Sequence, residues 1–162
     1  MTSWYLGAPK AWMRNSSMKM VNFHSGLLGV SETSSDMSDL LDRETQDVRA
    51  GEAVALFCYQ VKKWIGAFAA ALGGVDTLVF AGGIGENAPI VRARICDGLG
   101  FVGIELEEKR NAANEGVIST AASRVAVRVI RTDEEWMIAK TVCRVLGLGM
   151  ASEEGNSDHA TK

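Results

Sequence analysis

The sequence contains few cysteines, and their placement fits neither a disulfide framework nor a metal site. Cys58, Cys96 and Cys143 are odd in number and widely separated, with no Cys-x-x-Cys pair and no histidine beside them. A disulfide-stabilised secreted domain or a zinc module needs paired or clustered cysteines. We therefore expect three buried free thiols.

An excess of basic residues and a long uncharged apolar run are also lacking. The 17 Lys and Arg residues are outnumbered by 20 Asp and Glu, so nothing favours nucleic acid or an anionic membrane as a partner. The most apolar stretch, residues 53–72, carries Lys62 and Lys63 at its centre, which argues against a membrane span. The start "MTSWYLGAPK" has no basic segment followed by an apolar run, so we expect no signal peptide and a cytoplasmic protein.

The clearest element that the sequence predicts is a long helix. Apolar residues recur at three- and four-residue steps over residues 50–72, and Gly73-Gly74 follows as a C-cap would. The spacing predicts a wide core-facing stripe, with Trp64 in the core. Before this helix, Ser34, Ser35 or Asp36 can cap a shorter helix that reads "MSDLLDRE".

The second half of the chain alternates strand and helix signals. The apolar run at 76–81 predicts a central strand covered on both faces. A helix is expected over 88–98, with Asn87 as a candidate N-cap and Pro89 in its first turn. Residues 101–106 are a further candidate strand.

"EGVIST" and "RVAVRVIRT" (124–132) are expected to form a strand pair. A last helix follows, capped by Thr132 or Asp133, with Trp136 on its apolar face. The order of elements predicts an α/β domain. Residues 1–19 show no clear period and remain unassigned, and the polar tail 148–162 is expected to be disordered.

The chemistry-bearing candidate is the stretch "FAGGIGENAPIV" (80–91). A strand followed by a glycine turn and a helix can present bare backbone to a ligand at a helix N-terminus. The spacing is neither that of a P-loop nor G-x-G-x-x-G, and no lysine follows to hold phosphates. From spacing alone, a ligand-binding turn and a purely structural turn both remain open.

A second candidate is "TDEE" (132–135), which follows a strand and begins a helix. Its carboxylates can contact Mg²⁺, which prefers oxygen ligands. The spacing alone favours the other interpretation, that they cap the helix and complement its dipole.

Three stretches together resemble the C-terminal part of acetate kinase. They read "SGLLGVSETSSDMSDL" (25–40), "DTLVFAGGIGENAPIVRARICDGLGFVGIEL" (76–106) and "VIRTDEEWMIA" (129–139). The resemblance runs from about residue 20 to residue 147. It implies the ribonuclease-H-like fold of the actin and hexokinase superfamily, here as a partial, C-terminal nucleotide-binding domain over 20–132. It also implies a helix over 133–147 that packs on an N-terminal domain.

The resemblance implies roles for particular residues. The glycine turn lies against the adenosine of ATP or ADP in the family, which transfers to Gly83, Ile84, Gly85, Glu86 and Asn87. The loop "SSD" and its neighbours line the adenine side, which transfers to Asp36, Met37 and Ser38. The first Glu of T-[ND]-E-E is associated with Mg²⁺ in the family, and here it is Glu134.

The sequence departs from the family pattern in two ways. Ser38 stands where the family usually has Arg, so we expect weaker nucleotide binding. The N-terminal domain, with the carboxylate pocket and the catalytic residues, has no counterpart here, so no catalytic residue is assigned.

The family reaction, ATP + acetate = ADP + acetyl phosphate, is therefore not expected of this chain alone. The carboxylate substrate would bind only in the full-length enzyme. The alternative is a non-catalytic nucleotide-binding, dimerisation or complementation module. A homodimer or a complementing N-terminal half is the expected partner, and nucleic acid and membrane are not. A third alternative, a truncated gene product that retains no role, also remains open. The resemblance does not decide whether the phosphoryl acceptor is acetate, propionate or butyrate.

Overall fold

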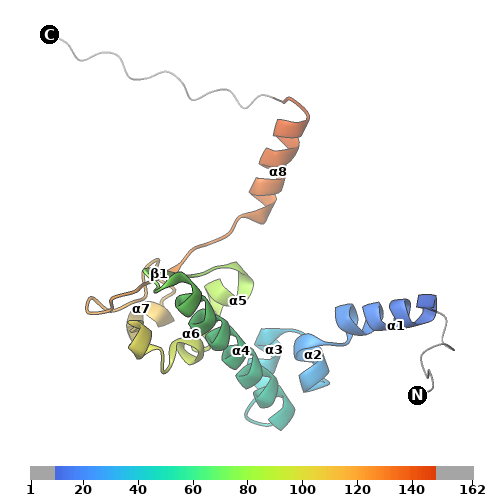
Figure 1. Cartoon of the computed structure of the whole chain (residues 1–162), viewed down its shortest axis with the longest axis horizontal. Coiled ribbons are helices and arrows are strands. Elements are labelled where there is room, and N and C mark those ends of the chain that lie inside the picture. Colours follow the sequence, from blue (N-terminus) through green and yellow to red (C-terminus); the bar gives the residue numbers. More distant parts are fainter. Residues whose placement is uncertain (1–9, 149–162) are drawn as a thin grey trace, which may run out of the picture. The chain divides into compact units, whose positions relative to one another are not determined.

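The computed structural model describes residues 10–148, except for the side chains of residues 10–16 and of Glu134. The chain divides into two units, Met1–Ile130 and Arg131–Lys162. It contains both helices and strands (Figure 1), which agrees with the expected α/β class. The elements are α1 (Lys10–Phe23), α2 (Gly26–Ser31), α3 (Met37–Arg43), α4 (Val48–Leu72), β1 (Thr77–Phe80), α5 (Gly82–Asn87), α6 (Pro89–Cys96), a 3₁₀ turn η1 (Gly100–Val102), α7 (Glu108–Ala112), β2 (Ala126–Val129) and α8 (Glu134–Val145).

The long helix α4 is the element on which much of the first unit packs. Asp47 caps its start by accepting hydrogen bonds from the backbone N–H groups of Arg49 and Ala50. Gly73, with a φ of 76°, ends it in the left-handed conformation that glycine adopts without strain. Helices α2, α3 and α6 contact α4, as Figure 1 shows for the arrangement of these ribbons.

Only the first half of α4 is fully covered. Its buried residues are Ala50, Ala53, Val54 and Cys58. Farther along the same stripe, Trp64 is 56% exposed and stacks on Phe68 at a ring distance of 5.9 Å. The expectation that Trp64 lies in the core is therefore wrong, because the apolar stripe is wider than the face that packs against the core, to which the adjacent Ile65 belongs. Trp136, on the apolar face of α8, is also exposed.

The described residues form one two-stranded sheet. β1 pairs with β2 in parallel, with Thr77 opposite Ala126 and Phe80 opposite Val129. Phe80 is buried, whereas Val79 is 46% exposed. The expectation of a central strand covered on both faces is therefore wrong for the described chain.

The expected strand over 101–106 is also not formed. This segment contains η1 and one isolated antiparallel bridge, between Leu106 and Ser119. Of the expected strand pair, the second segment forms β2. The first segment contributes an isolated antiparallel bridge between Val117 and Arg128.

One hydrophobic core joins the helices of the first unit to the inner face of this sheet. Its fully buried members include Leu40, Val54, Val91, Ile118 and Val127. The core thus connects α3, α4 and α6 to β2, and it fixes the segments between β1 and β2 that carry the candidate site.

The two ends of the chain are described only in part. The segment 1–19, unassigned from sequence, contains the start of α1 at Lys10, while residues 1–9 lie outside the described residues. Of the tail expected to be disordered, only Leu148 is described. None of the helices seen between residues 10 and 148 is long and apolar enough to cross a bilayer.

Candidate functional site

The stretch "GGIGEN" is a helix of its own rather than an open turn. Gly82, with a φ of 70°, turns the chain out of β1 and into α5. The side chain of Glu86 accepts a hydrogen bond from the Gly82 N–H at 2.9 Å, and Asn87 donates one to the Gly83 carbonyl at 3.0 Å. Asn87 therefore ends α5. The residue that caps α6 is Ala88, so the prediction of Asn87 as N-cap is wrong, although Pro89 does occupy the first turn of α6.

Two glycines of α5 have different surroundings. A Cβ added at Gly85 would lie 3.2 Å from the carbonyl carbon of Phe80, so the missing side chain lets α5 pack against β1. A Cβ added at Gly83 would meet nothing within 4 Å. Gly83 therefore leaves bare backbone open, whereas Gly85 serves close packing.

The second half of the site is the loop before α3. Asp36 is the N-cap of α3 and accepts hydrogen bonds from the backbone N–H groups of Ser38, at 2.7 Å, and Asp39, at 3.4 Å. This agrees with the prediction that Asp36 can cap this helix. Ser34 supports the loop by accepting a hydrogen bond from the Asp36 N–H and donating one to the Asp39 carboxylate.

These two segments, far apart in sequence, line one cavity of about 460 Å³. It brings together six of the eight residues expected to contact a nucleotide: Asp36, Met37, Ser38, Gly83, Ile84 and Asn87. Gly85 and Glu86 are not among its lining residues. The remaining lining residues are Ser35, Leu41, Ala88, Pro89 and Ile90, which sequence reasoning did not assign.

The cavity is mixed in character and carries little charge. Its apolar surface comes from Met37, Leu41, Ile84 and Ile90, and its described lining includes no lysine or arginine. Backbone, hydroxyl and amide groups supply its hydrogen-bonding capacity. Such a cavity suits a flat, polar-edged molecule better than a group carrying several negative charges.

One residue that supports the site was missed by sequence reasoning. Arg92 in α6 is fully buried and donates hydrogen bonds to the carbonyls of Gly85 and Glu86, at 2.8 and 3.1 Å. A signal was present, because Arg92 lies among the apolar positions Val91, Ile95 and Cys96 of "VRARIC". A charged residue on an apolar helix face indicates that the charge is buried and has hydrogen-bonding partners, but the sequence does not identify these partners.

The thiols lie outside the cavity lining. Cys58 and Cys96 are buried and free, whereas Cys143 is partly exposed, so the expectation of three buried thiols holds for two. Burial raises the pKa of the Cys96 thiol to about 12. Cys96 is therefore a neutral packing residue near pH 7.

The carboxylates at the start of α8 do not form a metal site with the side chains that are described. Asp133 caps α8 by accepting a hydrogen bond from the Trp136 N–H at 2.8 Å. The backbone of Glu134 begins α8, but its side chain lies outside the described part of the chain. Over the described residues, no group of three His, Cys, Asp or Glu side chains could hold a metal ion.

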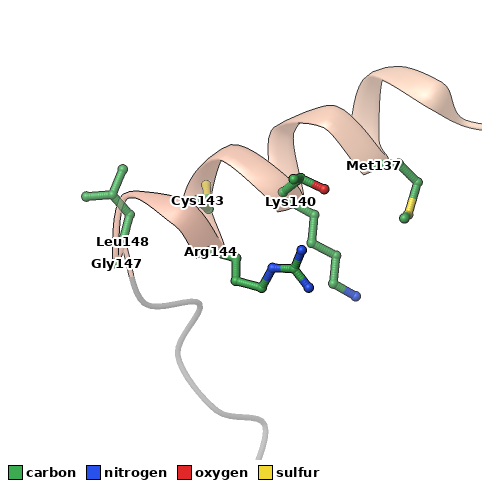
Figure 2. Close-up of a pocket in the computed structure, with 7 residues that line it drawn as sticks. Met137, Lys140, Cys143, Arg144, Gly147 and Leu148 are labelled. Carbon is green, nitrogen blue, oxygen red and sulfur yellow. The ribbon is translucent and has the colours of Figure 1, made fainter.

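A second hollow, of about 590 Å³, lies along α8 (Figure 2). Its lining comes from this helix and the turn that ends it, including Met137, Lys140, Arg144 and Leu148. Lys140 places its ammonium 4.8 Å from the centre of the Trp136 ring. Since one helix supplies all the described lining, the hollow is a groove along a helix surface and has no opposing wall.

The comparisons with known proteins decide the family. The sequence model of the Acetokinase family matches residues 5–140. The chain belongs to the acetokinase family. Within this family, it is 47% identical over 133 residues to acetate kinase of Thermoanaerobacterium thermosaccharolyticum and 46% identical over 130 residues to that of Symbiobacterium thermophilum. The family match begins at residue 5, earlier than residue 20, where the sequence resemblance was placed.

Solved structures of the acetokinase family have the same arrangement. The acetate kinase of Porphyromonas gingivalis superposes with a TM-score of 0.72 at 38% identity, covering 86% of this chain and 39% of that one. A propionate kinase of Francisella tularensis gives 0.71 at 29% identity, covering 83% and 37%.

The two acetate kinases compared by sequence cover 80% and 78% of this chain. The chain spans about a third of the length of these relatives.

Proposed function

We propose that the cavity between α3 and α5 binds the nucleoside part of ATP or ADP. The observation that supports this most directly is the meeting of Asp36, Met37 and Ser38 with Gly83, Ile84 and Asn87 around one cavity. The open backbone at Gly83 allows a flat ring to approach the main chain closely. The apolar residues of the lining would contact the faces of the base, and the polar groups its edge and the ribose.

The charge of the cavity lining decides which part of the nucleotide it can bind. Without a basic residue among the described lining, the cavity holds a nucleoside but does not neutralise phosphates. Ser38 cannot supply the stacking or the charge of an arginine, which in such a position contributes on the order of 1 kcal/mol. We therefore expect modest nucleotide affinity.

For the whole protein, we propose the reaction named by its relatives, phosphoryl transfer between ATP and a small carboxylate, with acetate or propionate as acceptor. Such transfer requires positioned groups that neutralise the charge of the phosphoryl group in flight. No such group lines the described cavity, so we propose that this chain does not catalyse the transfer alone. Glu134 remains our proposed contact for the Mg²⁺ that accompanies the nucleotide phosphates.

Binding can be tested by titrating the full chain with MgADP and with adenosine in a calorimeter. We expect both to bind, since the nucleoside supplies most of the contacts. Gly83→Val should weaken binding by about tenfold or more, because the side chain would occupy open space in the cavity. Gly66→Val is the matched control, a helical glycine in α4 that also has open space around it and lies off the cavity. Equal affinity of the two variants would contradict the proposed site.

Turnover is tested separately, by trapping acetyl phosphate as the hydroxamate from ATP and acetate. The chain alone should give no more product than its Glu134→Ala variant. A clear excess over that variant would show independent activity and contradict the proposal.

A second function, as an assembly module, is supported by a different observation. Trp64 and Phe68 are each more than half exposed and stacked on the uncovered half of α4. Exposed aromatic residues that lie side by side are typical of association surfaces. The two functions are compatible, since the aromatic pair is not part of the cavity lining.

A further inference from the structure

Arg92 is the largest fully buried side chain of the described chain, and its surroundings are unusual for a charged group. All its described hydrogen-bond partners are carbonyl or amide oxygens, and none is a carboxylate. Nε donates to the Asn111 Oδ1 at 2.8 Å. One terminal nitrogen donates to the carbonyls of Gly85 and Glu86, and the other to the Asn111 carbonyl at 2.7 Å and to the Asn114 Oδ1 at 2.6 Å.

A buried cation without a counter-charge is costly unless its N–H groups are satisfied. Arg92 donates five hydrogen bonds in all, which matches the donor capacity of a guanidinium. Its fork is planar and rigid, so the five acceptors are held in one fixed arrangement. A lysine, with a single nitrogen, cannot reach acceptors on both sides of the fork.

These acceptors belong to two helices, α5 and α7, and to the turn that follows α7. Gly85 and Glu86 are in the last turn of α5, where carbonyls lack partners within the helix and a positive charge is favourable. Asn111 is in α7 and also donates to the Pro89 carbonyl at 2.9 Å, at the start of α6. Arg92 itself is in α6. One side chain thus fixes the end of α5 against α6 and α7.

Such a support matters because α5 cannot hold its own position. Six residues, three of them glycine, are far below the length at which a helix is stable alone. Yet α5 carries Gly83, Ile84 and Asn87 to the cavity. The opposite wall, around Asp36, is fixed by its own capping bonds. The width of the cavity therefore depends on where α5 is held.

We propose that Arg92 is a positioning residue for the nucleotide cavity, acting through the carbonyls of Gly85 and Glu86 without lining the cavity itself. The inference rests on the proposed nucleotide-binding function. It assigns the cavity's shape to a guanidinium outside the lining, in addition to the residues that line it. Loss of Arg92 should loosen α5 and lower nucleotide affinity, even where the fold survives.

The test compares two arginines of the same helix in the full chain. Arg92→Lys keeps the positive charge but removes the planar guanidinium group with its five N–H donors. Arg94→Lys is the matched control, since Arg94 bonds Glu44 and does not line the cavity. Thermal unfolding first establishes that each variant folds. Calorimetry with MgADP then gives affinity, and amide hydrogen exchange followed by NMR gives the opening of α5.

We expect Arg92→Lys to bind MgADP about tenfold more weakly, as the loss of charge-assisted hydrogen bonds implies. The amides of Gly85 to Ala88 should exchange faster, while those of α3 keep their wild-type protection. Arg94→Lys should bind like the wild type. If Arg92→Lys does not fold, Asn114→Gly provides a milder version, because it removes one acceptor and suits the positive φ of 53° at that position. It should increase exchange at the same amides to a smaller degree.

The outcomes separate this inference from the function on which it rests. Wild-type affinity and wild-type exchange in Arg92→Lys would overturn the positioning role while leaving the nucleotide site in place. If the wild type itself binds neither MgADP nor adenosine, the proposed function falls. The exchange data then decide alone whether Arg92 holds α5. Uniformly faster exchange across the domain would also overturn the inference, because it would show general destabilisation.

Discussion

At the scale of single residues, the glycines of α5 show that one motif serves two purposes. Gly83 faces open space, whereas Gly85 lies where a side chain would press on the main chain of Phe80. From the sequence, both are equivalent members of "GGIGEN". In the structure, one is suited to approach a ligand and the other to pack a helix against a strand.

This difference predicts opposite effects of adding a methyl group. Gly85→Ala should lower the free energy of unfolding by about 1–2 kcal/mol, because α5 or β1 must shift. Gly83→Ala, also helical but unobstructed, should be neutral or more stable by about 0.5–1 kcal/mol. Urea unfolding of both variants measures this. If Gly85→Ala is as stable as Gly83→Ala, the close packing does not have the assigned role.

At the scale of elements, two arginines attach α6 to different neighbours. Arg94 of α6 forms a two-pronged ion pair with Glu44, the residue that ends α3, at 2.6 and 2.7 Å. The Glu44 carboxylate is 18% exposed. This pair connects α6 to the end of α3, and neither of its residues lines the cavity, whereas Arg92 connects α6 to α5.

The ion pair predicts a defined pH dependence. The hydrogen bond from Arg94 holds the pKa of Glu44 below its ordinary value of 4.5. Its stabilisation is therefore fully present above pH 4.5 and is lost as the pH falls through the lowered pKa. Glu44→Gln should lower the free energy of unfolding by about 1 kcal/mol at pH 7, after allowance for the partial exposure of Arg94. This deficit should shrink as the pH falls below 4.5.

Urea unfolding of Glu44→Gln at pH 7 and at pH 3.5 gives this comparison. Glu115→Gln is the control, since its pair with Arg110 is exposed and longer, at 3.8 Å. A deficit for Glu44→Gln that does not change with pH would argue against an ionic origin.

At the scale of the whole molecule, each of the two units leaves apolar surface uncovered. On α4, Trp64, Phe68 and Leu72 are between 56% and 77% exposed. On α8, Ile138 and Val145 are 64% and 75% exposed. Apolar faces of this kind are favourable when buried against a partner and promote association when left in water.

We expect the full chain to self-associate through the aromatic pair on α4. Light scattering after size-exclusion chromatography should show a mass above that of the monomer, which increases with protein concentration. The double variant Trp64→Gln/Phe68→Gln should shift the protein toward the monomer. Phe101→Gln is the control, because Phe101 is 78% exposed but lies in η1, away from α4. A concentration-independent monomer would contradict this expectation.

The sequence by itself determined the features that depend on neighbouring residues. These are the capping of α3 by one of the three residues 34–36, the start of α4 close to its predicted position, its end at Gly73, and the family, through three motifs in order. Capping and helix periodicity involve groups within a few residues of one another, so a sequence window contains the whole interaction.

Only the tertiary structure decided what covers each element and which distant residues meet. The apolar period of α4 gave no indication that Trp64 is exposed while the adjacent Ile65 packs against the core, because cover depends on which other elements lie against each face of the helix. The partners of Arg92 are 19 to 22 positions away for Asn111 and Asn114. Asp36 and Gly83 meet at the cavity because α3, α4 and α6 pack around a shared core. Such contacts depend on how the chain returns on itself, which no local pattern encodes.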